Sequence, residues 1–218
     1  MARSIRDEIF DHGYCFIADF EPKKDSPTVA SELGDPVTPW AGRLVQQLIP
    51  KQIDTPNTYS GIYGMRQFPF HTDLAHWKQP PRYLMLRCIR GYPQVPTLLI
   101  DGKEVVKAVS QDVLSRAVVK ARRPQAGSIP LLRLYEQVKD EYLLRWDQTF
   151  LQPTNSLAKI ARQRVAQILD ELQPLQIALC QSGDTLLVDN WRMLHARSPI
   201  PIGCEDRCVD RVYLGRII

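Results

Sequence analysis

The feature that most constrains the fold is a run of strand-like segments at the C-terminal end, joined by short turns with no helix between them. Such consecutive segments favour antiparallel pairing. The chain shows no alternation of strands and helices and no Gly-x-Gly-x-x-Gly motif, which argues against a dinucleotide-binding fold. We therefore predict a mainly β protein with flanking helices, a double-stranded β-helix (jelly-roll, cupin-like) barrel. The C-terminal segments are 175–180, 185–189, 192–197 and 207–217.

The remaining segments give weaker patterns. We expect strands at 14–20, 83–89, 97–100, 130–134 and 141–146, where apolar, β-branched or aromatic residues gather. Helical spacing predicts helices at 4–12, 41–48, 105–121 and 155–172, with Gly13 ending the first and Asn155 capping the last. Residues 21–40 carry four prolines and are expected to form a loop, and residues 57–70 an extended lead into His71.

Composition indicates an ordinary globular protein. With 218 residues, 44% of them hydrophobic and 24% charged, residues 1–218 are expected to form a single domain. The net charge of +4 is too small to indicate a nucleic-acid partner, and no apolar run is long enough to span a membrane. No signal peptide is recognisable and the five cysteines are scattered, so we expect a cytoplasmic protein without disulfides that acts on a small molecule. The sequence gives no indication of the oligomeric state.

His71, Asp73 and His195 form the candidate metal site. If residues 71–73 are extended, His71 and Asp73 point to the same face, and the fold has to bring His195 to them. Two imidazoles and one carboxylate leave an open side on an octahedral ion, which is the arrangement of non-haem iron(II) oxygenases.

Two arginines near the C-terminus predict an acidic ligand close to that site. In a strand over 207–214, Arg207, Arg211 and Tyr213 share one face. Guanidinium groups directed into a barrel are costly to bury unless they meet anions, and arginine pairs well with carboxylates.

These residues carry a resemblance to a known family. Residues 70–89, 96–101 and 183–215, together with the entry strand after Gly13, resemble the iron(II)/2-oxoglutarate-dependent dioxygenases of the taurine dioxygenase (TauD/TfdA) superfamily, most closely the clavaminate synthase-like branch. The resemblance implies a hydroxylase that uses dioxygen, acts on an unactivated C–H bond and releases succinate and carbon dioxide. An aspartate at position 73 occupies the place that related halogenases leave to chloride, which favours hydroxylation or desaturation.

The resemblance also assigns roles to single residues. His71, Asp73 and His195 match the iron ligands. Arg207 and Thr97 match the residues that hold the distal carboxylate of 2-oxoglutarate, and Arg211 and Gln67 match substrate contacts. The implied substrate is small and anionic, an amino acid or a natural-product precursor. Trp77 and Tyr63 either line the substrate pocket or belong to the core.

Other readings of the same residues stay open. His76 is a rival third ligand, although a role at the pocket edge fits the resemblance better, and Arg197 is expected in a structural ion pair. The chain is alternatively an inactive ligand-binding protein of the same barrel fold, or a zinc-dependent hydrolase. Dependence on iron with 2-oxoglutarate, against zinc alone, separates these possibilities.

Overall fold

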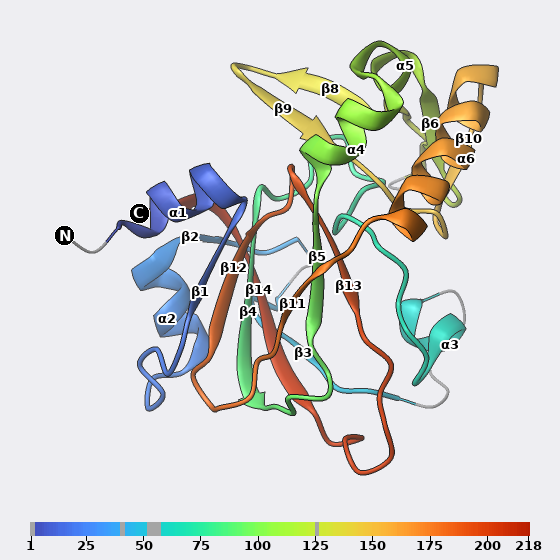
Figure 1. Cartoon of the computed structure of the whole chain (residues 1–218). Coiled ribbons are helices and arrows are strands. Elements are labelled where there is room, and N and C mark those ends of the chain that lie inside the picture. The colour runs from blue at the N-terminus through green and yellow to red at the C-terminus, as the bar shows by residue number, and fades with distance from the viewer. Residues whose placement is uncertain (1–2, 40–41, 52–57, 125–126) are drawn as a thin grey trace.

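The computed structural model describes residues 3–39, 42–51, 58–124 and 127–218, and within them two facing antiparallel sheets form the barrel (Figure 1). The larger sheet has the order β1-β12-β4-β14-β2, and β3 pairs with residues 209–211 of β14. The smaller sheet has the order β11-β5-β13. This is the predicted double-stranded β-helix, and two small sheets, β10-β6-β7 and β8-β9, lie beside it.

The barrel strands have the following bounds: β1 Tyr14–Ile17, β2 Gly34–Val37, β3 Gln46–Leu48, β4 Tyr83–Arg90, β5 Thr97–Asp101, β11 Leu175–Ile177, β12 Thr185–Asp189, β13 Met193–Arg197 and β14 Cys208–Ile217. The accessory strands are β6 Val118–Ala121, β7 Leu131–Arg133, β8 Tyr135–Val138, β9 Glu141–Leu144 and β10 Leu151–Pro153. The helices are α1 Ile5–His12, α2 Ser26–Leu33, α3 Tyr59–Tyr63, α4 Gly102–Val109, α5 Gln111–Arg116 and α6 Ser156–Glu171.

The larger sheet is buried on both faces because apolar residues occupy alternate positions on both sides of its central strands. On β4, Leu84, Leu86 and Cys88 face the smaller sheet and pack against residues such as Leu99. Met85 on the same strand faces outward, where α1 and α2 cover it (Figure 1). The cavity described below shares part of this apolar core, because Leu84, Leu86 and Val209 also line its wall.

A third core lies at the end of the barrel where α4, α5 and α6 pack with the accessory strands (Figure 1). The predicted cap of α6 is confirmed: the Asn155 side chain accepts the N–H of Ala158 and also donates to the carbonyl of Arg116. Among the described residues, no helix is both long and apolar enough to cross a membrane.

The structure corrects four of the predicted segments. Residues 21–40 contain α2 and β2 rather than only a loop, because Asp25 caps a helix that tolerates Pro27 in its first turn. The segment 105–121 is two helices and a strand, broken where Ser110 has a φ of 92°. Of the helix expected at 41–48, Ala41 lies outside the described residues, and residues 46–48 pair with β14 as a strand. The segment 57–70 contains the short helix α3, with Asn57 outside the described residues.

Candidate metal centre and its pocket

Backbone pairing brings the two histidines together. The N–H of His71 donates to the carbonyl of His195 at 3.0 Å, and the N–H of His195 donates back at 2.9 Å. This isolated antiparallel bridge holds the segment before residue 72 against β13. The imidazole centroids are consequently only 4.4 Å apart, although the residues are far apart in the sequence.

A turn, rather than a continuing strand, brings Asp73 to the pair. His71 forms the last bridge, the N–H of Thr72 still donates to the carbonyl of Trp146 at 2.8 Å, and Leu74 has a left-handed φ of 54°. The buried side chain of Asn190 fixes this turn, because it accepts the N–H of Asp73 at 2.7 Å and donates to its carbonyl at 3.0 Å. His71 and Asp73 therefore converge although Asp73 lies in a turn.

The three side chains form a compact donor set. Asp73 Oδ1 lies 3.6 Å from His71 Nε2 and 3.7 Å from His195 Nε2, and one donor atom from each residue falls within 4.8 Å of the others. His71 Nδ1 lies 2.9 Å from the carbonyl of Pro69, which places the proton on Nδ1 and leaves Nε2 as an electron-pair donor. Two imidazoles and a carboxylate, all buried, fit a divalent metal ion.

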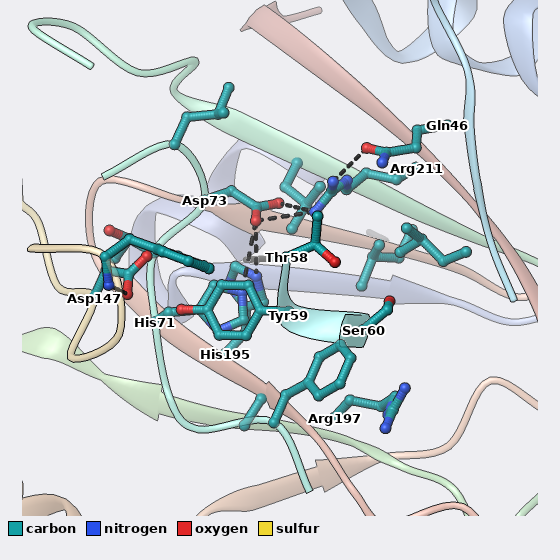
Figure 2. Close-up of a pocket in the computed structure, with 18 of the residues that line it drawn as sticks. Gln46, Thr58, Tyr59, Ser60, His71, Asp73, Asp147, His195, Arg197 and Arg211 are labelled. Atoms are coloured by element: carbon teal, nitrogen blue, oxygen red, sulfur yellow. Dashed lines mark hydrogen bonds and ion pairs between the residues drawn. The ribbon is translucent and has the colours of Figure 1, made fainter. Parts of the chain in front are cut away.

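The other side of the Asp73 carboxylate is held by β14. Arg211 Nη1 donates to both carboxylate oxygens, at 2.8 and 3.0 Å (Figure 2), and the Tyr213 hydroxyl donates to Oδ2 at 3.0 Å. Burial alone would raise the pKa of Asp73, but the charge of Arg211 and the two histidines outweigh it and hold the pKa well below its ordinary value. The carboxylate is therefore held as an anion through both oxygens, and Oδ1 also faces the imidazoles.

A cavity of about 670 Å³ opens from the donor set and runs between the two sheets. Its wall includes the three donor residues and the polar side chains of Thr97, Arg197, Arg207 and Arg211. This volume suits a small ligand. The structure thus brings the three predicted metal ligands to one pocket with Thr97, Arg207 and Arg211.

Arg207 is the most unusual of these residues. Its side chain is buried, with 4% of the residue exposed, and it makes no hydrogen bond or ion pair with any of the described residues. Burial lowers its pKa, as expected for a cation removed from water without a compensating anion. Buried charges are ordinarily paired, so this guanidinium indicates an anion that the pocket is built to receive.

Arg197 is not in the ion pair that the sequence suggests. Its Nη2 donates to the carbonyls of Gly64 and Arg66, at 2.6 and 2.7 Å, and its guanidinium lies 3.7 Å from the centroid of the Phe68 ring. Burial and the nearby charge of Arg207 lower the pKa of Arg197 to about 10. Neither Arg197 nor Arg207 therefore has a carboxylate partner among the described residues.

The remaining predicted contacts lie off the pocket wall. Gln67 is exposed, and Trp77 lines a separate hollow together with Trp191. Tyr63 stacks on Tyr59 instead of reaching the cavity, and its hydroxyl lies 2.9 Å from Thr149 Oγ1. His76, the rival ligand, lines the cavity but does not belong to the donor set found among the described residues.

Two pocket residues are absent from the sequence-based site. Tyr59, from α3, stacks on His71 with ring centroids 4.4 Å apart, and its hydroxyl faces Asp147 (Figure 2). Burial and the charge of Asp147 raise the pKa of this phenol. Asp147 is itself buried and accepts the N–H groups of Thr149 and Phe150. No local pattern could have identified either residue, because both reach the site through the tertiary fold.

Known proteins resemble this chain in sequence and in structure. Clavaminate synthase 2 from Streptomyces clavuligerus is 29% identical over 161 residues, 66% of this chain and 49% of that protein, so the chain spans about half the length of this curated relative. Asparagine oxygenase aligns with a TM-score of 0.66 and 23% identity over 85% of this chain and 61% of that chain. The non-haem iron oxygenase OrfP, in complex with Fe and alpha-ketoglutaric acid, aligns with a TM-score of 0.68 and 20% identity over 96% of this chain and 77% of that chain.

The solved structures share the fold, and the family assignment rests on the sequence. The description of the matching family reads "Taurine catabolism dioxygenase TauD, TfdA family", and the match extends over residues 2–213, nearly the whole chain. The donor set, Arg207, Arg211 and the two facing sheets, apart from the last residues of β14, lie within the matched range. The chain therefore belongs to the TauD/TfdA dioxygenase family.

Proposed function

We propose that this protein is an iron(II)- and 2-oxoglutarate-dependent oxygenase that hydroxylates an unactivated C–H bond of a small anionic substrate, with release of succinate and carbon dioxide. One observation carries the proposal: the buried, unpaired Arg207 lines the same cavity as the His71, Asp73 and His195 donor set. A metal site beside a site for a buried carboxylate matches a cosubstrate that has a chelating end and an acidic end.

The donor set would hold the iron. His71 and His195 offer neutral imidazole nitrogens, and Asp73 offers Oδ1, which faces them and also accepts a hydrogen bond from Arg211. The metal and its cosubstrate, when bound, supply the oxidising chemistry that uses dioxygen. The chain's own contribution is to fix three ligands on one side, so that the opposite side stays open to ligands.

Arg207 and Thr97 would hold the distal carboxylate of 2-oxoglutarate. Both residues are buried in the wall of the cavity. Thr97 lies on β5 and Arg207 lies directly before β14, and these two strands face each other across the cavity. A carboxylate at Arg207 would neutralise a charge that is otherwise removed from water without a partner, so that binding is favoured at this point of the pocket.

Arg211 would bind the acidic group of the substrate through the side of its guanidinium that does not hold Asp73. Its Nη2 now donates to Gln46 Oε1 on β3, an exposed residue of the cavity wall (Figure 2). The class of substrate is drawn from the relatives: asparagine oxygenase was solved with a hydroxyasparagine and succinate, and OrfP with a hydroxyarginine. An amino acid or an amino-acid-derived precursor is therefore the substrate class we propose, resting on Arg211 rather than on Gln67, Trp77 or Tyr63.

We further propose that residues 1–218 act as a single domain in the cytoplasm. The family match over residues 2–213 supports one domain. So do the hydrophobic clusters, because each joins residues that are far apart in the sequence. All five cysteines are free, which suits a reducing compartment.

An oxygen-free titration tests the function before the substrate is known. Iron(II) is added to the apoprotein, then 2-oxoglutarate, and the visible charge-transfer band of the chelate is recorded. We expect a band only when both are present, and we expect Arg207→Met to need much more 2-oxoglutarate to form it. Iron binding without a band would refute the proposal and favour an inactive ligand-binding protein. Binding of zinc with hydrolytic activity would favour the hydrolase.

A further inference from the structure

The segment over residues 58–68 covers the metal centre. Thr58, Tyr59, Ser60 and Phe68 line the cavity, and the Tyr59 ring stacks on His71 (Figure 2). The covering segment, as we name residues 58–68, joins β13 through the N–H of Phe68, which donates to the carbonyl of Arg197 at 3.0 Å. How firmly this segment is held therefore decides how well the centre is shielded from water.

The side chain of Arg197 holds the covering segment through hydrogen bonds. Its Nη2 reaches two carbonyls, those of Gly64 and Arg66, on the turn that follows α3. Its guanidinium plane stacks on Phe68, which is itself a wall residue. Arg197, which lies on β13 two residues after His195, thus contacts the segment at three residues.

Arg197 and Arg207 lie around the same part of the cavity. Both side chains line it, neither has an acidic partner among the described residues, and Arg197 pairs in register with Thr97, the residue proposed to hold the carboxylate together with Arg207. Two like charges in a site of low dielectric repel each other strongly. A carboxylate bound at Arg207 would remove that repulsion and allow Arg197 to hold the carbonyls of the covering segment more tightly.

We propose that Arg197 is a positioning residue that couples binding of the cosubstrate carboxylate at Arg207 to fastening of the covering segment over the metal centre. This inference rests on the proposed function, because it needs an acidic ligand at Arg207. Coupling of this kind is reciprocal: if the ligand tightens the segment by some factor, the fastened segment tightens the ligand by the same factor.

Hydrogen exchange of the amides of residues 59–68 tests the coupling. The protein is loaded with iron(II) under argon and measured with and without saturating 2-oxoglutarate. In the wild type we expect the cosubstrate to slow exchange in this segment by about fivefold or more, within the range of about 5–150-fold typical of coupled sites. In Arg197→Met we expect the slowing to be lost and the Kd for 2-oxoglutarate to rise by a similar factor, while iron affinity is unchanged.

A matched control removes a guanidinium that does not approach Arg207. Arg66 lies in the same segment, is exposed, and donates to the carbonyl of Ile62 within its own helical turn. Arg66→Met should therefore keep both the slowing by 2-oxoglutarate and the wild-type Kd. Arg197→Lys keeps the charge but lacks the planar fork, and it should recover less than half of the slowing.

The outcomes separate the inference from the function on which it rests. The charge-transfer band is recorded on the same samples. No band in the wild type would refute both. A band in the wild type without any change in exchange over 59–68 would overturn the coupling alone, even if Arg197→Met does not fold. The coupling is also overturned if Arg197→Met folds and shows the wild-type slowing and Kd.

Discussion

Replacing Arg207 by methionine should weaken cosubstrate binding without weakening the fold. The guanidinium is buried with 4% of the residue exposed and has no partner among the described residues, so its removal leaves no protein group unsatisfied. Replacing a buried charge by an apolar side chain of similar length is often neutral or stabilising, by up to about 4 kcal/mol. We therefore expect the ligand-free variant to unfold at the wild-type free energy or above it.

The affinity for 2-oxoglutarate should respond in the opposite direction. Losing one partner of a buried, hydrogen-bonded charge pair costs roughly 2–5 kcal/mol of binding free energy. At about 1.4 kcal/mol per tenfold, this corresponds to a rise in Kd of about 30-fold to several thousandfold. The assay is the oxygen-free titration monitored through the charge-transfer band, with the iron concentration held at saturation.

Arg87 provides a control with the same burial and the opposite expectation. Only 2% of this residue is exposed, but its guanidinium donates to four carbonyls and to Thr185 Oγ1, at 2.7–3.3 Å. Because Arg87→Met removes five hydrogen bonds and leaves the carbonyls of Phe20 and Lys24 without this donor, we expect a loss of at least about 3 kcal/mol in the free energy of unfolding. Urea unfolding measures both variants. The reasoning fails if Arg207→Met is destabilised as much as Arg87→Met, or binds 2-oxoglutarate as the wild type does.

Three further outcomes follow from the same contacts. Asp73→Ala should abolish hydroxylation and weaken iron binding while the far-UV circular dichroism stays unchanged, and full activity would contradict the ligand assignment. Asn190→Ala should lower the free energy of unfolding by roughly 2–4 kcal/mol, as measured in urea, because it leaves the N–H and carbonyl of Asp73 unsatisfied in the interior. Burial raises the pKa of the Cys88 thiol to about 11, so alkylation by iodoacetamide at pH 8 should be absent in the folded protein and appear on unfolding.

Local rules predicted the parts of the fold that local forces form. The first helix ends at Gly13, which has a φ of 80°, as the sequence predicts, and the structure shows that Ser4 caps its beginning. The segments 185–189 and 193–197 are strands because their buried apolar residues suit a sheet covered on both faces. Where the prediction failed, a neighbour distant in sequence decided the outcome: residues 46–48 form a strand only because β14 offers them an unpaired edge.

The candidate site likewise has features that the sequence determined and features that only the tertiary structure decided. The sequence by itself determined which chemistry was possible, because two histidines, one aspartate and a pair of arginines are the side chains that bind a divalent ion and an acidic ligand. Only the tertiary structure decided which arginine is free for that ligand. Arg87, Arg197 and Arg207 carry the same charge, but backbone carbonyls satisfy the first two, and the third is left facing the cavity. Such pairing depends on groups far apart in the chain, whose approach the packing of the two sheets fixes and no local pattern records.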